Sequence, residues 1–536
     1  MESGRALHKS RSFRNKIIYT LCIIFLMIPM FLLSQPSSGR GSGGEHGSPG
    51  GLLERLRSED KINVEDVGEV NMTAETVRLG TFGLNGVAQM MLWQKAEEAK
   101  KKKDWSTLAA TLNQLIILNP HLESVWRFQG WNLAYNVSVE CDNYKDRYEW
   151  VKRGIRFLES GTKYNPRSIR ITWDVGWTTA QKISRSDERV QFRQLFREDD
   201  EFNKDRPLEE RDSWIVGRLW YRKAEALNEK EGVDLGTISP TLFFSYAPNA
   251  QAYYSDNIEQ DGIFDHRARR AWETFSAEWK AFGEKELDSA TGDKMRLEDE
   301  EKERAKADMY REQLEALSPG LYQRLVDTKR ARLTPLELEA VDTPFEERTA
   351  DQHNIASDAS EKIRVSNEEW AGNLPPDLRT KGMELAKLLD AASQQAQLIR
   401  RYRMIVNYKF WRLRGQLEKT DEIMEARRLI YEADIAFMDG DLVSAKDNYD
   451  AALRLWNQMI RTEQFDEIID EEMFGSDLRE LIDKYEIILS QLNQTLPADF
   501  PLREVLERTS PTDDALLYDM RRRLIQDEQR GFQMIQ

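Results

Sequence analysis

The sequence predicts an all-α protein in which an N-terminal transmembrane helix is followed by helical hairpins in a solenoid-type array. Three observations lead to this prediction. Residues 17–33 carry no charge, the chain from about Met72 has long periodic segments with few strand-like runs, and Asn-Pro pairs punctuate it. A length of 536 residues is enough for two to four domains or for one extended array.

Composition narrows the possible classes of function. The chain has 77 Lys+Arg against 93 Asp+Glu, a formal net charge of −16, and 40% hydrophobic residues, which are enough for a buried core. Because a nucleic-acid groove needs a basic surface, no nucleic-acid partner is expected. Two cysteines, Cys22 and Cys141, exclude a disulfide framework and a cysteine-based zinc site.

The N-terminus predicts a membrane anchor with a defined orientation. Residues 1–16 form a basic tail of net charge +4, and the uncharged run 17–33 has a length at the short end for a transmembrane helix. Positive flanks stay in the cytoplasm, so the rest of the chain is expected on the extracytoplasmic side of the inner membrane. A cleaved signal peptide is the alternative, although no A-x-A-like site follows Leu33.

A flexible tether is predicted directly after the anchor. In residues 34–51, 14 of 18 residues are Gly, Ser or Pro, a composition that buries too little apolar surface to fold. The tether would hold the folded part clear of the lipid.

Helical hairpins are predicted from about residue 87. Apolar residues at helical spacing precede Asn119-Pro120, and the next unit opens with Trp126 and Gln129-Gly130 and closes at Asn165-Pro166. We expect Gly130 to let two helices approach closely while Trp126 fills the space beside it. A third unit opens at Trp173.

The clearest hairpin lies near the C-terminus, across residues 428–460. Ala433, Ala445, Tyr449 and Ala452 have the spacing of the small and aromatic positions of a 34-residue helical repeat, and residues 439–441 supply the turn. These residues, with those at 87–202, resemble tetratricopeptide repeats.

A broader resemblance covers most of the chain after residue 70. The stretches ITWDVGWTTAQKI, QFRQLFREDDEF, LFFSYAPNAQAYY and VNYKFWRLRGQLEKTDEIMEARRLIYEAD are similar to an uncharacterised family of membrane-anchored planctomycete proteins. That resemblance implies a bacterial inner-membrane protein and no established activity.

The predicted organisation has two helical modules. The tetratricopeptide-like module spans 70–282, a charged helix with an irregular linker spans 283–365, and a second helical module spans 366–536 and contains the unit at 428–460. Within the linker, the polar stretch 334–360 is predicted to be an irregular connection.

The candidate binding residues are aromatic. Eleven of the 14 Trp residues lie between Trp93 and Trp279, where they either build the core between helices or line a binding face. The stretch 242–254 is predicted to be a loop, either with exposed aromatic side chains or tucked against the fold. We select Trp220, Tyr246, Tyr253 and Tyr254 as binding residues.

No recognisable catalytic motif is present, so no catalytic residue, cofactor or metal ligand is assigned. The chain lacks HExxH, Gly-x-Ser-x-Gly and a phosphate-binding Gly-rich loop. Two weaker alternatives remain: the acidic run 198–201 is either a cation site or a solvated helix end, and Asp265-His266 is either an acid/base pair or a surface pair.

The sequence therefore predicts a membrane-anchored scaffold that binds a protein or peptide partner on the extracytoplasmic side. Two alternatives stay open. One is an enzyme that uses carboxylates or His266, and the other is a structural envelope protein that associates with itself.

Overall fold

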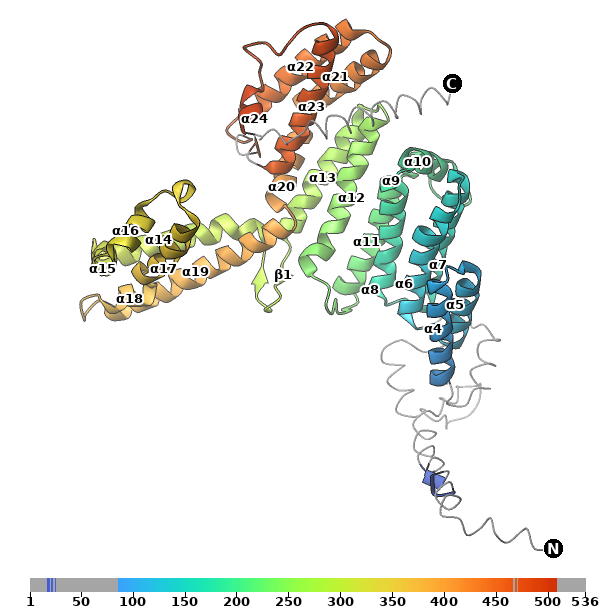
Figure 1. The fold of residues 1–536 in the computed structure, drawn as a ribbon, viewed down its shortest axis with the longest axis horizontal. Coiled ribbons are helices and arrows are strands. Elements are labelled where there is room, and N and C mark those ends of the chain that lie inside the picture. Colours follow the sequence, from blue (N-terminus) through green and yellow to red (C-terminus); the bar gives the residue numbers. More distant parts are fainter. Residues whose placement is uncertain are drawn as a thin grey trace, which may run out of the picture. The chain divides into compact units, whose positions relative to one another are not determined.

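The computed structural model describes residues 17–19, 21–22, 25, 85–465, 468–469 and 471–508 (Figure 1). The described chain is almost entirely helical, which confirms the all-α class, and one antiparallel pair of two-residue strands is added. Contacts divide the chain into two compact units, unit 1 (Met1–Val233) and unit 2 (Asp234–Gln536).

The predicted N-terminal segments lie mostly outside the described residues. Residues 1–16, most of the predicted anchor 17–33, the predicted tether 34–51 and the stretch after 508 are not described. Ile17–Tyr19, Leu21, Cys22 and Phe25 are helical. Within the described part, the structure contains no helix whose length and apolar character would let it cross a membrane.

Unit 1 is a succession of helix pairs. Its helices are α4 (Asn85–Lys101), α5 (Trp105–Leu118), α6 (Glu123–Trp131), the π-helix η2 (Asn132–Val137), the 3₁₀ turn η3 (Ser138–Glu140), α7 (Tyr144–Tyr164), α8 (Ile169–Trp177), the π-helix η4 (Thr178–Lys182), α9 (Ile183–Arg185), α10 (Arg189–Glu198), the 3₁₀ turn η5 (Leu208–Glu210) and α11 (Ser213–Glu229). The helices pair as α4 with α5, α6 with α7, and α8 with α11 (Figure 1).

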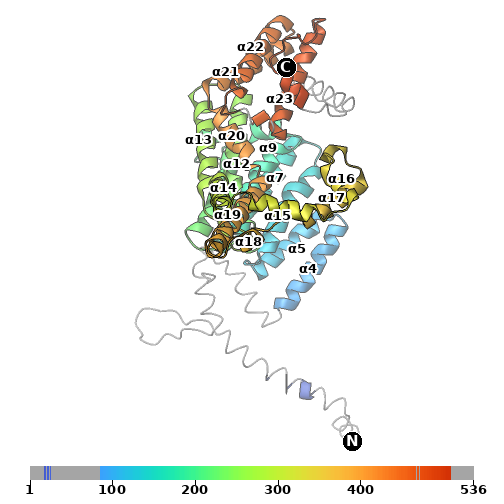
Figure 2. The same cartoon turned by 90° about the vertical axis from the view of Figure 1, so that its left-hand side faces the viewer.

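The first pair follows from its apolar spacing and its turn. Leu108, Leu112 and Leu115 recur on one face of α5 and are fully buried against α4. The turn ends at Asp104, whose side chain caps α5 by accepting a hydrogen bond from the Thr107 N–H at 3.1 Å. Helices α4 and α5 lie side by side in both views (Figures 1 and 2).

The second pair, α6 and α7, crosses at small residues. A Cβ atom on Gly154 would lie 2.8 Å from the Gly130 carbonyl oxygen and 3.0 Å from Ala134 Cβ, so the two backbones touch there. Gly161 leaves room for the Trp126 ring in the same way. The close approach expected at Gly130 is confirmed.

The third pair repeats this crossing. A Cβ atom on Gly217 of α11 would lie 2.8 Å from the Gly176 carbonyl oxygen and 2.7 Å from Ala180 Cβ. In both pairs the α-helix becomes a π-helix just after the crossing, two residues beyond Gly130 and two residues beyond Gly176. The same local structure therefore occurs twice, although α8 and α11 are separated by a long excursion through α9 and α10.

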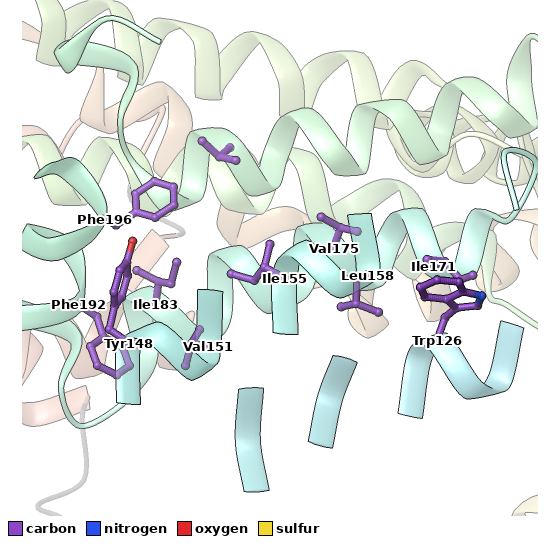
Figure 3. Packing of buried hydrophobic residues seen from close by; sticks show 11 residues of the cluster. Trp126, Tyr148, Val151, Ile155, Leu158, Ile171, Val175, Ile183, Phe192 and Phe196 are labelled. Atoms are coloured by element: carbon purple, nitrogen blue, oxygen red, sulfur yellow. The ribbon is translucent and has the colours of Figure 1, made fainter. Parts of the chain in front are cut away.

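An apolar cluster in unit 1 joins the second and third pairs. Figure 3 shows Val151, Ile155 and Leu158 of α7 beside Ile171 and Val175 of α8. Phe192 and Phe196 of α10 pack at the other end, so the excursion between α8 and α11 is attached to the same core.

Substitution of Gly154 should loosen the second pair. Gly154→Ala would place a methyl group against the Gly130 carbonyl, which cannot move without its helix, so we expect a loss of about 1–3 kcal/mol in the free energy of unfolding. Urea unfolding followed by tryptophan fluorescence measures the loss. Gly86→Ala in α4 is the control, since no atom lies within 4 Å of its new methyl group. Equal midpoints for the two variants would contradict the crossing.

Unit 2 is a larger helical assembly. Its elements are α12 (Pro240–Gln260), α13 (His266–Glu284), β1 (Leu287–Asp288), β2 (Lys294–Met295), the 3₁₀ turn η6 (Leu297–Asp299), α14 (Glu300–Leu317), α15 (Leu321–Arg330), α16 (Pro335–Asp342), the 3₁₀ turn η7 (Phe345–Glu347), α17 (Ala350–Ile363), α18 (Asn367–Gly372), α19 (Arg379–Ile405), α20 (Tyr408–Glu418), α21 (Asp421–Met438), α22 (Leu442–Ile460), α23 (Glu472–Gln491) and α24 (Arg503–Arg508).

An aromatic core holds α12, α13 and α20 together. Trp279 of α13 stacks on Trp411 of α20 at 5.8 Å, and Phe275 meets the same ring edge-to-face at 6.0 Å. Tyr408 lies across Gly283 so closely that a Cβ there would overlap its hydroxyl group, which donates a 2.5 Å hydrogen bond to Glu298.

Next to this core lies a buried cluster of charges. Arg414 of α20 donates to Asp256 of α12 at 2.8 Å, and Arg427 of α21 pairs with Glu418 at 2.7 Å and with Glu259 of α12. Both guanidinium groups lie over the Trp272 ring, and the Trp272 indole donates to Glu259 at 2.6 Å. Because buried charges need partners, this cluster fixes the arrangement of four helices.

The segment between α13 and α20 forms a helical protrusion. Helices α14 and α19 run side by side, and α15 to α18 cover their far end (Figures 1 and 2). The predicted irregular connection at 334–360 is wrong, because α16 and α17 occupy most of it. Thr334 and Thr349 form capping boxes with Glu337 and Gln352, and these boxes begin the two helices.

The hairpin predicted at 428–460 corresponds to α21 and α22. Ala433, Ala445, Tyr449 and Ala452 are all fully buried between neighbouring helices. Gly440 has φ of +82°, a conformation that favours glycine, and Asp441 caps α22 by accepting from the Ser444 N–H at 3.1 Å.

Removal of one buried arginine should destabilise unit 2 strongly. Arg427→Gln leaves Glu259 buried without its cation and leaves Glu418 with Arg414 alone, so we expect a loss of about 3–5 kcal/mol in the free energy of unfolding, measured by urea titration with circular dichroism. The neighbouring Arg428→Gln is the control. Within the described residues Arg428 pairs with Glu425 and Glu432 of its own helix, so this substitution should cost about 0.5 kcal/mol. A similar loss for both variants would refute the role of the cluster.

Candidate functional site

The strongest candidate site lies on unit 1, where two similar sequences place tryptophans in equivalent positions. Gly130-Trp131-x-x-Ala134 and Gly176-Trp177-x-x-Ala180 each supply the glycine and the alanine of a helix crossing. Since the glycine faces the partner helix of its own pair, the following tryptophan points away from that contact. Trp131 and Trp177 therefore take equivalent positions on the first helices of successive pairs.

These side chains and their neighbours form a continuous row, which we call the aromatic face: Trp131, Tyr135, Trp173 and Trp177. The Trp131 and Tyr135 rings stack at 6.1 Å with 18° between their planes, and the Trp173 and Trp177 rings stack at 5.1 Å with 20°. A hydrogen bond between Trp177 and the Tyr135 hydroxyl joins the two stacks. Trp173 also lies 5.9 Å from the Tyr221 ring of α11.

The two π-helices shape this face. Tyr135 lies in η2 and Lys182 in η4, at the ends of the first helices of their pairs. Hydroxyl groups compensate for the displaced backbone carbonyls, since Ser138 donates to the Ala134 carbonyl at 2.6 Å and Thr179 to the Val175 carbonyl at 2.8 Å. Single π turns inside α-helices are frequent at functional sites.

Charged side chains flank the aromatic face. Arg127 of α6 forms an ion pair with Asp174 of α8, and this pair bridges the second and third helix pairs. Burial raises the pKa of the Asp174 carboxyl above its ordinary value, and Arg127 opposes that rise. The Lys182 ammonium lies 5.1 Å from the Tyr135 ring centre, and burial lowers its pKa. Burial also raises the pKa of Tyr135 to about 12, so its hydroxyl stays neutral.

The arrangement is suited to binding rather than to a covalent step. Trp131 is 45% exposed, and the other three aromatic side chains are half-buried, so flat apolar surface is available beside cationic groups. Tryptophan and tyrosine supply large contact areas with little loss of side-chain entropy, and they are enriched at protein-binding sites.

The four residues selected from the sequence are not part of the aromatic face, and they lie in different units, one in unit 1 and three in unit 2. Trp220 is half-buried in α11 of unit 1, packs on the apolar cluster, and carries the Lys223 ammonium 4.4 Å from its ring centre. Tyr246, Tyr253 and Tyr254 are half-buried in α12 of unit 2. Tyr253 meets the Trp411 ring edge-to-face at 6.2 Å, and Tyr254 packs beside Ile258.

The loop predicted at 242–254 is wrong. The whole stretch belongs to α12, which begins at Pro240 and continues through Pro248. Proline at the first position suits a helix start, while an internal proline usually argues against a helix. Phe243, Phe244 and Ala247 are buried, so tertiary packing holds the helix despite Pro248. Whether the selected tyrosines bind a partner stays a prediction.

The acidic run 198–201 and the Asp265-His266 pair, which the sequence left as alternative sites, are both held by neighbouring side chains or backbone groups. In the run 198–201, Asp199 accepts from Lys152 at 3.0 Å, and Asp200 and Glu201 pair with Arg211 and Arg156. Asp265 caps α13 by accepting from the Arg267 N–H, and the exposed His266 lies 4.0 Å from it. Among the described residues, no group of three or more His, Cys, Asp or Glu is arranged to hold a metal ion.

The sequence prediction did not include the aromatic face, because it selected mainly aromatic residues in a stretch expected to be a loop. The signal that identifies it is the repeated Gly-Trp-x-x-Ala, which marks both the crossing and the tryptophan beside it. Its two copies are 46 residues apart, more than the 34 residues of a tetratricopeptide repeat, because a long connection follows α6.

The chain matches no family model, no curated protein and no solved structure. The resemblance to tetratricopeptide repeats therefore stays a prediction from the sequence.

The Arg127–Asp174 pair should couple the second and third helix pairs. In a double-mutant cycle of Arg127→Ala and Asp174→Asn, we expect a coupling of about 1 kcal/mol in the free energy of unfolding, because Arg127 is partly solvated. Urea unfolding of the four proteins gives the value. If Asp174→Asn costs the same in the Arg127→Ala background as in the wild type, the pair does not link the helices.

Proposed function

We propose that the protein is a scaffold that binds a protein or peptide segment through the aromatic face of a tetratricopeptide-like array. In this proposal, residues 17–33 anchor the chain in the cytoplasmic membrane as a single span, and the array lies on the extracytoplasmic side. The uncharged run 17–33 and the basic residues before it support this orientation.

The packing of the second helix pair supports the tetratricopeptide-like interpretation. In such a repeat, the first helix carries a tryptophan and a glycine. The second helix carries a small residue, a large residue four positions further on, and a closing proline. Trp126 and Gly130 face Gly161 and Gly154, and Leu158 and Asn165-Pro166 take the remaining places. The third pair repeats the glycine crossing with Gly176 and Gly217.

The observation that carries the proposed function is the continuity of the aromatic face across two helix pairs. Successive first helices each present a stacked pair of rings, and a hydrogen bond joins the stacks. An extended segment or a helix that lies across the pairs can contact both stacks at once. The acidic balance of the chain favours a protein partner over a nucleic acid.

Site-specific photo-crosslinking tests the proposed function. A photoreactive phenylalanine analogue in place of Trp131 in the full chain, expressed in its native cells, should give a defined crosslinked protein. The control places the analogue at Trp150, a half-buried tryptophan of α7 whose ring is covered by the Arg153 guanidinium at 4.6 Å. Crosslinks at Trp150 but not at Trp131 would reject the aromatic face.

Alanine substitution then measures the contribution of the face. Against the partner identified by crosslinking, we expect Trp131→Ala to weaken binding by about 2 kcal/mol, roughly thirtyfold, as is typical of a hot-spot residue. Isothermal titration calorimetry with the purified chain gives the change, and Trp150→Ala is the matched control. Unchanged affinity in Trp131→Ala would show that the partner binds elsewhere.

A further inference from the structure

Helix α4, the first described helix of the array, has an exposed apolar face. Val87, Met90 and Met91 are 45%, 65% and 63% exposed, and they lie on one side of the first half of the helix. Ala96 and Ala99 on the other side are buried against α5. An exposed group of apolar side chains such as this one indicates a surface that binds another molecule.

A run of lysines continues from the same helix. Lys100–Lys103 end α4 and form its turn, and the last three are exposed. Between the apolar half and the lysines lies Trp93, 37% exposed, which packs on Phe128 at 6.4 Å. An apolar face beside a tryptophan and clustered lysines is a feature of helices that bind the interface of an anionic bilayer. With Glu97, Glu98 and Asp104 counted against five lysines, residues 95–104 carry a net charge of +2.

A second copy of the chain fits this face less well than a lipid surface does. Two parallel α4 helices would bring their lysine runs together. Two antiparallel helices would place each run beside the N-terminus of the other, where the helix dipole is positive. An anionic lipid surface attracts the lysines and accepts the methionines at the same time.

We infer that the first half of α4 binds the surface of an anionic lipid bilayer. This inference rests on the proposed function only in that the anchor would hold α4 near the bilayer. Only 51 residues separate Leu33 from Asn85, so α4 follows the proposed anchor closely in the chain. Binding would fix the start of the array at the membrane.

Fluorescent labelling of the full chain in vesicles tests the inference. Cys22 and Cys141 are replaced by serine, Met91→Cys is labelled with an environment-sensitive dye, and nitroxide-bearing lipids serve as quenchers. In vesicles containing phosphatidylglycerol we expect quenching at position 91, and in pure phosphatidylcholine much less. Tyr144→Cys in α7, 40% exposed, is the control position and should remain unquenched.

Two comparisons make the result decisive. Each lysine of Lys100–Lys103 changed to glutamine should shift the equilibrium away from the bilayer by about fivefold, whereas Lys145→Gln and Lys163→Gln in α7 should not. A blue shift at position 91 without lipid quenching means that protein covers the face, and it overturns the inference. So does the absence of any change at position 91.

A label on the natural Cys22, with Cys141→Ser, reports the anchor separately. Quenching at Cys22 without quenching at position 91 leaves the anchor standing and rejects the lipid site on α4. Quenching at position 91 without quenching at Cys22 supports the lipid site and rejects the anchor.

Discussion

Unit 1 depends on the contact of helix backbones at paired glycines. Where Gly154 faces Gly130 and Gly217 faces Gly176, no side chain separates the helices, so the axes come closer than leucine-sized residues would allow. This short separation brings the Trp126 ring against Gly161 and the Tyr221 ring against Gly176. Trp131 and Trp177 each follow a glycine that lies in the crossing, so their side chains point away from the partner helix. The candidate site is thus a by-product of the packing.

In unit 2, large aromatic side chains and buried ion pairs, rather than glycines, hold the helices together. Trp272, Trp279 and Trp411 fill the space between α13 and α20, and two arginines neutralise carboxylates from α12 and α20. A buried ion cluster adds little net stability compared with apolar packing, but each charge tolerates only the arrangement that supplies its partners. The cluster therefore selects one register for α12, α20 and α21.

The sequence predicts those parts of the fold whose cause is local. The turn at residues 439–441 follows from adjacent residues, and the close approach at Gly130 is indicated by the spacing of Trp126 and Gly130 on one helix. The helix through Pro248 and the helices at 335–363 depend on burial against distant elements or on capping boxes hidden in a polar stretch. The aromatic face was missed for a related reason, since its four rings meet only when two helix pairs are stacked.

The excursion between α8 and α11 affects the order in which the array folds. Twelve residues separate α6 from α7, while 35 separate α8 from α11. Closing the longer loop costs about 1 kcal/mol more in chain entropy, and it must be completed before the Gly176–Gly217 contact forms. Long-range contacts of this kind slow folding. Helix α8 is therefore expected to assemble first on α7, with α10, so that the earlier pair serves as a template for the later one.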